Sequence, residues 1–112
     1  MTLDEYQDRA RSTAIYPEAA RVLYPTLKLA GEAGEVAEKL GKLMRDEGLA
    51  PGDALSPAQR DALAKEIGDV LWYVANLAGD LGLSLEAIGQ GNLEKLASRR
   101  DRGMLQGSGD ER

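Results

Sequence analysis

Residues 29–43 read LAGEAGEVAEKLGKL and carry the strongest structural signal in the chain. Apolar residues recur there at alternating steps of four and three, which is the spacing of one face of an α-helix. These residues are Leu29, Ala33, Val36, Leu40 and Leu43. Proline suits the first turn of a helix and glycine its end. We therefore expect a helix from Pro25 to about Glu47, with Gly48 as its stop.

Capping signals on either side predict further helices. Thr2 with Glu5 and Ser56 with Gln59 have the spacing of capping boxes, and Ser84 has the chemistry of an N-cap. The expected helices run from Leu3 to about Ala14, from Pro57 to about Leu81 and from Leu85 to about Arg100. The helix after Ser56 has its own apolar stripe: Leu63, Ile67, Val70, Val74, Leu77 and Leu81. No β-hairpin signal is present, so we predict an all-α fold of antiparallel helices joined by short loops.

The bulk composition limits the possible functions. The 112 residues suffice for one domain, which we place at 1–102, followed by a Gly- and charge-rich tail at 103–112 that we expect to be flexible. The chain has no Cys and no His, which excludes disulfides, thiol nucleophiles, imidazole catalysis and the usual zinc ligands. A net charge of −5 argues against binding a nucleic-acid polymer. The polar, acidic N-terminus and the lack of a long apolar run predict a cytoplasmic protein with no membrane segment.

Acidic residues three positions apart mark both central helices. At 3.6 residues per turn, Glu32 lies roughly 50° from the centre of the apolar stripe and Glu35 about 110° from it. On the following helix Glu66 lies about 70° and Asp69 about 130° from the stripe centre. Glu38 points outward, whereas Tyr73 and Asn76 share the flank of Glu66 and Asp69. If the helices pack antiparallel through their stripes, four carboxylates converge at the seam.

A divalent cation would relieve the repulsion between these carboxylates. With oxygen ligands alone, the residues favour magnesium or manganese. The alternative is a solvated acidic face in which Lys39, Lys42 and Lys65 form ordinary surface pairs. Gly31 and Gly34 bracket Glu32, and glycine at these helical positions indicates either close approach of a ligand or backbone, or tight helix packing.

Two segments together resemble the MazG-type all-α nucleoside triphosphate pyrophosphohydrolases. Residues 29–38 (LAGEAGEVAE) and 66–73 (EIGDVLWY) match the family's Glu-x-x-Glu pair followed by Glu-x-x-Asp on the next helix. Residues 92–96 (NLEKL) extend the resemblance, which covers about Leu27 to Gly103. The loop at residues 48–55 makes the gap between the acidic pairs longer than is usual in the family.

The resemblance implies a four-helix bundle, assembled as a dimer or a dimer of dimers, with a site completed across the interface. It implies magnesium-dependent hydrolysis of a nucleoside triphosphate to the monophosphate and pyrophosphate, with two or more ions per site. The implied metal ligands are Glu32, Glu35, Glu66 and Asp69, with Glu35 preferred as general base and Glu32 as a second catalytic carboxylate. The candidates for substrate contact are Glu38, Lys39, Lys42, Tyr73, Asn76, Asn92, Lys95, Arg99 and Arg102.

Several alternatives remain at this point. The same superfamily contains deoxyuridine triphosphate hydrolases and phosphoribosyl-ATP pyrophosphohydrolases, and the base preference is not readable from the sequence. A non-catalytic helical assembly protein would carry the same acids as surface decoration. Trp72 falls opposite the apolar stripe, which fits either an oligomer interface or stacking on a base.

Overall fold

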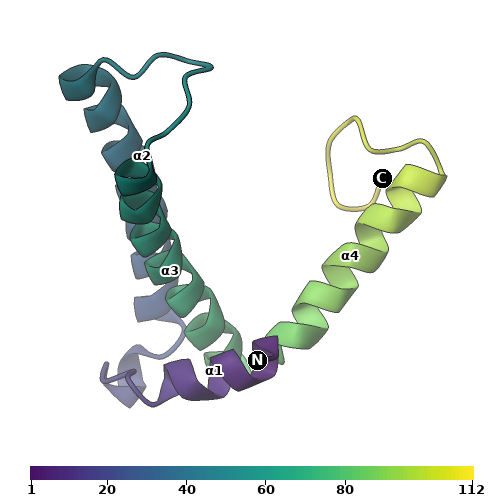
Figure 1. Cartoon of the computed structure of the whole chain (residues 1–112). Helices are drawn as coiled ribbons and strands as arrows, with labels where there is room; N and C mark the ends of the chain where they lie inside the picture. The colour runs from purple at the N-terminus through teal and green to yellow at the C-terminus, as the bar shows by residue number, and fades with distance from the viewer.

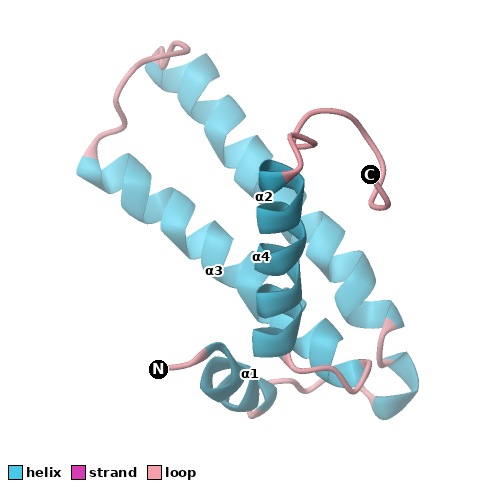
Figure 2. Cartoon of the chain, turned by 90° about the vertical axis from the view of Figure 1, so that its right-hand side faces the viewer, coloured by secondary structure: helices cyan, strands magenta, loops and turns pink.

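The structure is a computed structural model that describes all 112 residues, and it contains helices but no strands (Figure 2). This confirms the all-α prediction. The elements in chain order are α1 (Leu3–Arg11), the short 3-10 helix η1 (Glu18–Ala20), α2 (Leu23–Glu47), α3 (Pro57–Asp80) and α4 (Leu85–Asp101). None of these helices combines the length and the apolar character that crossing a bilayer requires.

Side-chain caps determine where the helices begin and end. Both predicted capping boxes are present: Thr2 accepts from Glu5 N at 3.0 Å, and Ser56 accepts from Gln59 N at 3.1 Å. Ser84 caps α4 by accepting from Ala87 N. At the end of α2, Gly48 adopts a left-handed φ of 70°, a conformation in which glycine avoids the steric cost of a Cβ atom.

Two helix ends differ from the prediction. Helix α1 ends at Arg11, three residues early, because the hydroxyls of Ser12 and Thr13 donate back to the carbonyls of Arg9 and Ala10. Helix α2 begins at Leu23, two residues before Pro25. Proline is tolerated there because the first-turn N–H groups of a helix have no intrahelical partner in any case.

Helices α2 and α3 form a long antiparallel hairpin, and α1 crosses its base (Figure 1). Helix α4 starts beside α1 and diverges from the hairpin instead of lying along it. The small core lies where α1, α3 and α4 meet, around Ala10, Ala75 and Leu85. Tyr6, Trp72 and Val74 pack against it.

The chain alone leaves much of its predicted apolar stripe uncovered. Leu43 is buried, but Ile67 is 56% and Leu81 52% exposed, and only 8 of 112 residues are buried. The radius of gyration is 17.1 Å, whereas a compact domain of this length would have about 13 Å. A Cβ atom built at Gly31 or Gly34 would meet no atom of another segment within 4 Å, so neither close backbone approach nor tight helix packing occurs at these glycines within one chain, and the approach of a ligand stays a prediction.

Candidate metal centre

Three carboxylates converge between α2 and α3. Glu32 on α2 and Glu66 and Asp69 on α3 each offer one oxygen, and these three oxygens lie within 4.8 Å of one another. The step of three places Glu66 and Asp69 one above the other on α3, and the antiparallel packing of the hairpin brings Glu32 opposite them. An all-oxygen, anionic donor set of this kind fits a hard divalent cation such as Mg²⁺ or Mn²⁺.

The charge of this group is only partly balanced by the protein. Glu32 and Glu66 are half-buried and Asp69 is exposed. Lys39 Nζ lies 2.9 Å from Glu66 Oε1 and joins α2 to α3 across the seam. One ammonium group against three carboxylates leaves an excess of negative charge, which favours a bound cation.

The other two acids of α2 lie apart from the group. Glu35 is exposed and is not among the three converging carboxylates. Glu38 forms an i,i+4 ion pair with Lys42 at 3.1 Å, and both side chains are more than half exposed. Such a pair is typical of a solvated helix face and contributes little to stability.

Aromatic side chains continue the site away from the carboxylates. A cavity of about 360 Å³ is lined by Thr13, Glu32, Asp69, Trp72 and Tyr73. A second cavity of about 360 Å³ shares Thr13, Trp72 and Tyr73 with the first and is otherwise enclosed by Ile15, Tyr16, Pro17 and Tyr24. The arrangement therefore joins an acidic end to an end with aromatic walls.

Tyr73 stands at the junction of the two cavities. Burial, the neighbouring Tyr24 hydroxyl and the negative charges of Glu32 and Asp69 raise the pKa of Tyr73 to about 12. Its hydroxyl is therefore neutral at physiological pH and remains able to donate a hydrogen bond.

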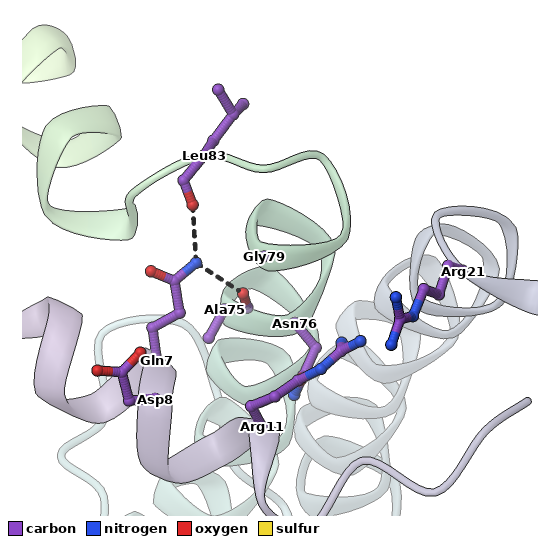
Figure 3. A pocket seen from close by; sticks show the side chains of 8 residues that line it. All are labelled: Gln7, Asp8, Arg11, Arg21, Ala75, Asn76, Gly79 and Leu83. Carbon is purple, nitrogen blue, oxygen red and sulfur yellow. Dashed lines mark hydrogen bonds between the residues drawn. The ribbon is translucent and has the colours of Figure 1, made fainter. Parts of the chain in front are cut away.

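The structure places Asn76 and Trp72 beside α1 and the turn that follows it, an environment that α2 and α3 alone do not predict. Asn76 is 1% exposed and belongs to the wall of a different cavity, of about 430 Å³, between α1 and the end of α3 (Figure 3). Its Nδ2 donates to Trp72 O, and its Oδ1 has no partner. Trp72 is half-buried and donates from Nε1 to Thr13 Oγ1 at 2.9 Å. Asn76 therefore does not line the carboxylate cavity, because α1 covers this side of α3, whereas the two roles predicted for Trp72 stay predictions.

The candidate substrate contacts on α4 do not line the carboxylate cavity. Lys95 and Arg99 approach Asp110 of the C-terminal segment at 3.1 and 3.4 Å, and Arg99 is 4% exposed. Arg102 donates to the Arg112 carbonyl oxygen at 3.0 Å. Asn92, Lys95 and Arg99 lie on the helix that diverges from α2 and α3, and Arg102 directly follows the end of this helix (Figure 1).

Asp80, a residue with no predicted role, is a buried anchor at the end of α3. Its side chain is 0% exposed and lies 2.6 Å from Arg11 Nη1. A carboxylate in the last turn of a helix is disfavoured by the helix dipole. That unfavourable placement is the one sequence signal that pointed to a special role for this residue.

Comparison with known proteins agrees with this geometry. Residues 24–104 match the family model described as the MazG nucleotide pyrophosphohydrolase domain, so the match spans the converging carboxylates and α4 and begins after α1. The chain is 47% identical over 118 aligned positions to the Gene 37 protein of Mycobacterium phage L5, and the alignment covers 100% of both chains. No solved structure matches the chain.

Proposed function

The chain belongs to the MazG nucleotide pyrophosphohydrolase family, and we propose that it hydrolyses ribo- or deoxynucleoside triphosphates between the α and β phosphates. The products are the nucleoside monophosphate and pyrophosphate. The observation that carries this proposal is the convergence of Glu32, Glu66 and Asp69 within the part of the chain that matches the family. We assign the activity to control or house-cleaning of the nucleotide pool.

The carboxylates are the residues that would hold magnesium, or manganese in its place. Glu32, Glu66 and Asp69 form the group, and Glu35, one turn further along α2, is the fourth ligand that the family motif implies. Two or more bound ions would neutralise phosphate charge and activate a water molecule.

The side chains of the chain itself then position the substrate and move the proton. Glu35, which is exposed, is suited to accept the proton of the attacking water, with Glu32 as the second catalytic carboxylate. Lys39 already lies at the seam, 2.9 Å from Glu66, and can neutralise charge on the outer phosphates. Glu38 and Lys42 pair with each other next to this edge and are the outermost candidates.

The aromatic cavity is suited to the nucleoside. The rings of Trp72 and Tyr73 meet edge to face with centroids 4.8 Å apart, and Tyr24 closes the opposite side. The flat face of a nucleobase gains contact with such walls by stacking. Because this cavity shares Trp72 and Tyr73 with the acidic one, a base held there has its phosphates directed toward the carboxylates.

A second copy of the chain completes the fold and the site in this proposal. The accessible surface is 7822 Å², whereas a compact monomer of 12.0 kDa would have about 6,000 Å². The excess is comparable with what each partner buries in an obligate dimer. The apolar residues of this surface that a second copy would cover include Leu27 (64% exposed), Ile67 (56%) and Leu93 (63%).

A dimer or tetramer could bring Asn92, Lys95, Arg99 and Arg102 of one copy to the phosphates at the other copy's site. Light scattering that gives a monomer mass at micromolar concentration would contradict this part of the proposal.

Product analysis tests the reaction. The protein is incubated with magnesium and each common ribo- and deoxynucleoside triphosphate, and the products are resolved by ion-exchange chromatography. We expect monophosphate and pyrophosphate, and loss of both in Glu35→Gln. Glu94→Gln makes the same change at an exposed acid on α4 whose partner is Gln90, and it should leave turnover unaffected.

The other outcomes identify the alternatives. Turnover of dUTP alone indicates a deoxyuridine triphosphate hydrolase, and turnover of phosphoribosyl-ATP alone indicates the second superfamily activity. Release of diphosphate and phosphate would show that the wrong bond has been assigned. No turnover, together with no stabilisation by magnesium, would favour the assembly protein.

A further inference from the structure

Asp80 accepts hydrogen bonds from three donors in residues 11–22, which precede α2. Its Oδ1 accepts from Arg11 Nη1 at 2.6 Å, and its Oδ2 accepts from the Tyr16 hydroxyl at 2.8 Å and from Val22 N at 2.9 Å. Burial alone would raise the pKa of Asp80, but the Val22 N–H, Tyr16 and Arg11 together lower it below its ordinary value. The side chain is thus a charged, fully buried anchor that joins residues 11–22 to the end of α3.

The Val22 N–H belongs to a strained turn. Val22 has φ 69° and ψ −54°, and Leu23 N donates to Arg21 O at 2.8 Å, which defines a γ-turn of the rare, strained kind with a positive φ. Val22 is the only residue other than glycine with a positive φ in the chain. A β-branched residue in this region is an outlier that persists only where its surroundings hold it.

The strained turn leads directly into the aromatic cavity. Tyr24, two residues later, stacks on Tyr16 with ring centroids 5.1 Å apart and an interplanar angle of 28°. Tyr24 also lies 6.2 Å from the Tyr73 ring. Asp80 therefore holds two of these three tyrosines, Tyr16 directly and Tyr24 through the turn at Val22.

We propose that Asp80 is a positioning residue for substrate selection, which fixes the Tyr16–Tyr24 wall of the cavity by holding the strained turn at Val22. Asp80 does not itself line this cavity, so it acts through the two tyrosines. The inference rests on the proposed function, because it takes this cavity as the binding site for the base. Its consequence is that the discrimination between bases depends on a carboxylate outside the carboxylate centre.

The experiment compares Asp80→Asn with Asp46→Asn. Asp46 is also bound to an arginine, Arg45 at 2.7 Å, but it lies exposed near the end of α2, which makes it a matched control. KM, kcat and the ranking of the common triphosphates are measured with magnesium for each variant, together with thermal unfolding. An amide side chain has a single acceptor oxygen and cannot satisfy the three donors. A hydrogen bond to a charged group corresponds to about tenfold in an equilibrium constant. We expect Asp80→Asn to raise KM by about that factor, to compress the ranking of bases and to change kcat much less.

Tyr16→Phe keeps the experiment informative if Asp80→Asn does not fold. It removes one hydroxyl donor to Asp80 and retains the ring that stacks on Tyr24. It should raise KM in the same direction, while Asp46→Asn should match the unmodified protein. The proposal would be overturned if the kcat of a variant falls only in proportion to the fraction of the protein that is folded, while KM and the ranking of bases stay unchanged. No turnover by the unmodified protein would overturn the proposed function first, and this inference with it.

Discussion

Removal of one carboxylate from the converging group should abolish most of the stabilisation by magnesium. The change is Glu66→Gln, which preserves the shape of the side chain. Without metal its effect should be small. The Lys39 ion pair that is lost is worth at most about 1 kcal/mol, because Lys39 is 37% exposed. The repulsion among the three carboxylates is relieved at the same time, which opposes that loss.

With magnesium the unmodified protein and Glu66→Gln should differ in stability. At a concentration 100 times its Kd, the ion stabilises the unmodified protein by about 2.7 kcal/mol. Mutating partners of metal ligands costs about 10- to 100-fold in affinity, so we take about 100-fold for the loss of a ligand itself. At the same magnesium concentration the variant then gains only about 0.4 kcal/mol. With about 4 °C per kcal/mol for a domain of this size, the increases in Tm are about 11 °C and about 2 °C.

Differential scanning fluorimetry over a magnesium titration at pH 7 measures both increases. Glu94→Gln has the same change in charge outside the site and should behave like the unmodified protein. Equal increases for the unmodified protein and Glu66→Gln would refute the assignment of Glu66 as a ligand. The absence of any increase in the unmodified protein would refute the metal centre and support the assembly protein.

Three further predictions concern other parts of the chain. The pKa of Tyr73 is raised to about 12, so its neutral form favours the folded state and this contribution is lost as the pH rises from about 10 through 12. Urea unfolding across this range should show a shallower loss of stability in Tyr73→Phe, and an unchanged slope would contradict the assignment. Leu93→Glu places a charge on an exposed apolar position of α4 and should shift the protein toward monomer in light scattering, whereas an unchanged mass would remove α4 from the interface. Ser56→Ala removes the cap of α3 and should lower the free energy of unfolding by about 1 kcal/mol in urea titrations, with the magnesium-dependent increase in Tm retained.

The features predicted well from the sequence are those that depend on local chemistry. Thr2 and Ser56 cap helices because their hydroxyls reach N–H groups three residues away, and Gly48 ends α2 because it lacks a Cβ atom. The convergence of Glu32 with Glu66 and Asp69 could also be predicted from the sequence. It requires only the helical step and an antiparallel pair.

The features that were missed depend on contacts between distant segments. Asn76 and Trp72 were placed on α3 without knowledge of α1 and of the turn that follows it. In that turn Thr13, 59 positions away in sequence, accepts the Trp72 N–H. The role of Asp80 depends on donors 58 to 69 positions away. Helical periodicity gives the direction of a side chain but not the segment that it meets.

The position of α4 links the oligomer proposal to the chemistry. A triphosphate bound at the carboxylates brings several negative charges, and within the hairpin Lys39 is the cation that lies at the seam. Lys95 and Arg99 of α4 instead pair with Asp110, and Arg102, just after α4, donates to the Arg112 carbonyl oxygen. If one chain were to bring these cations to its own carboxylates, α4 would have to swing across to the hairpin and lose its contacts with α1, among them the hydrogen bonds from Ser84 Oγ and Glu86 N to Asp4. A second copy could supply the same cations without breaking those contacts, and it would cover the exposed apolar stripe in the same step. Because the second copy would supply the cations and cover the apolar surface together, we expect Leu93→Glu to lose turnover and assembly together.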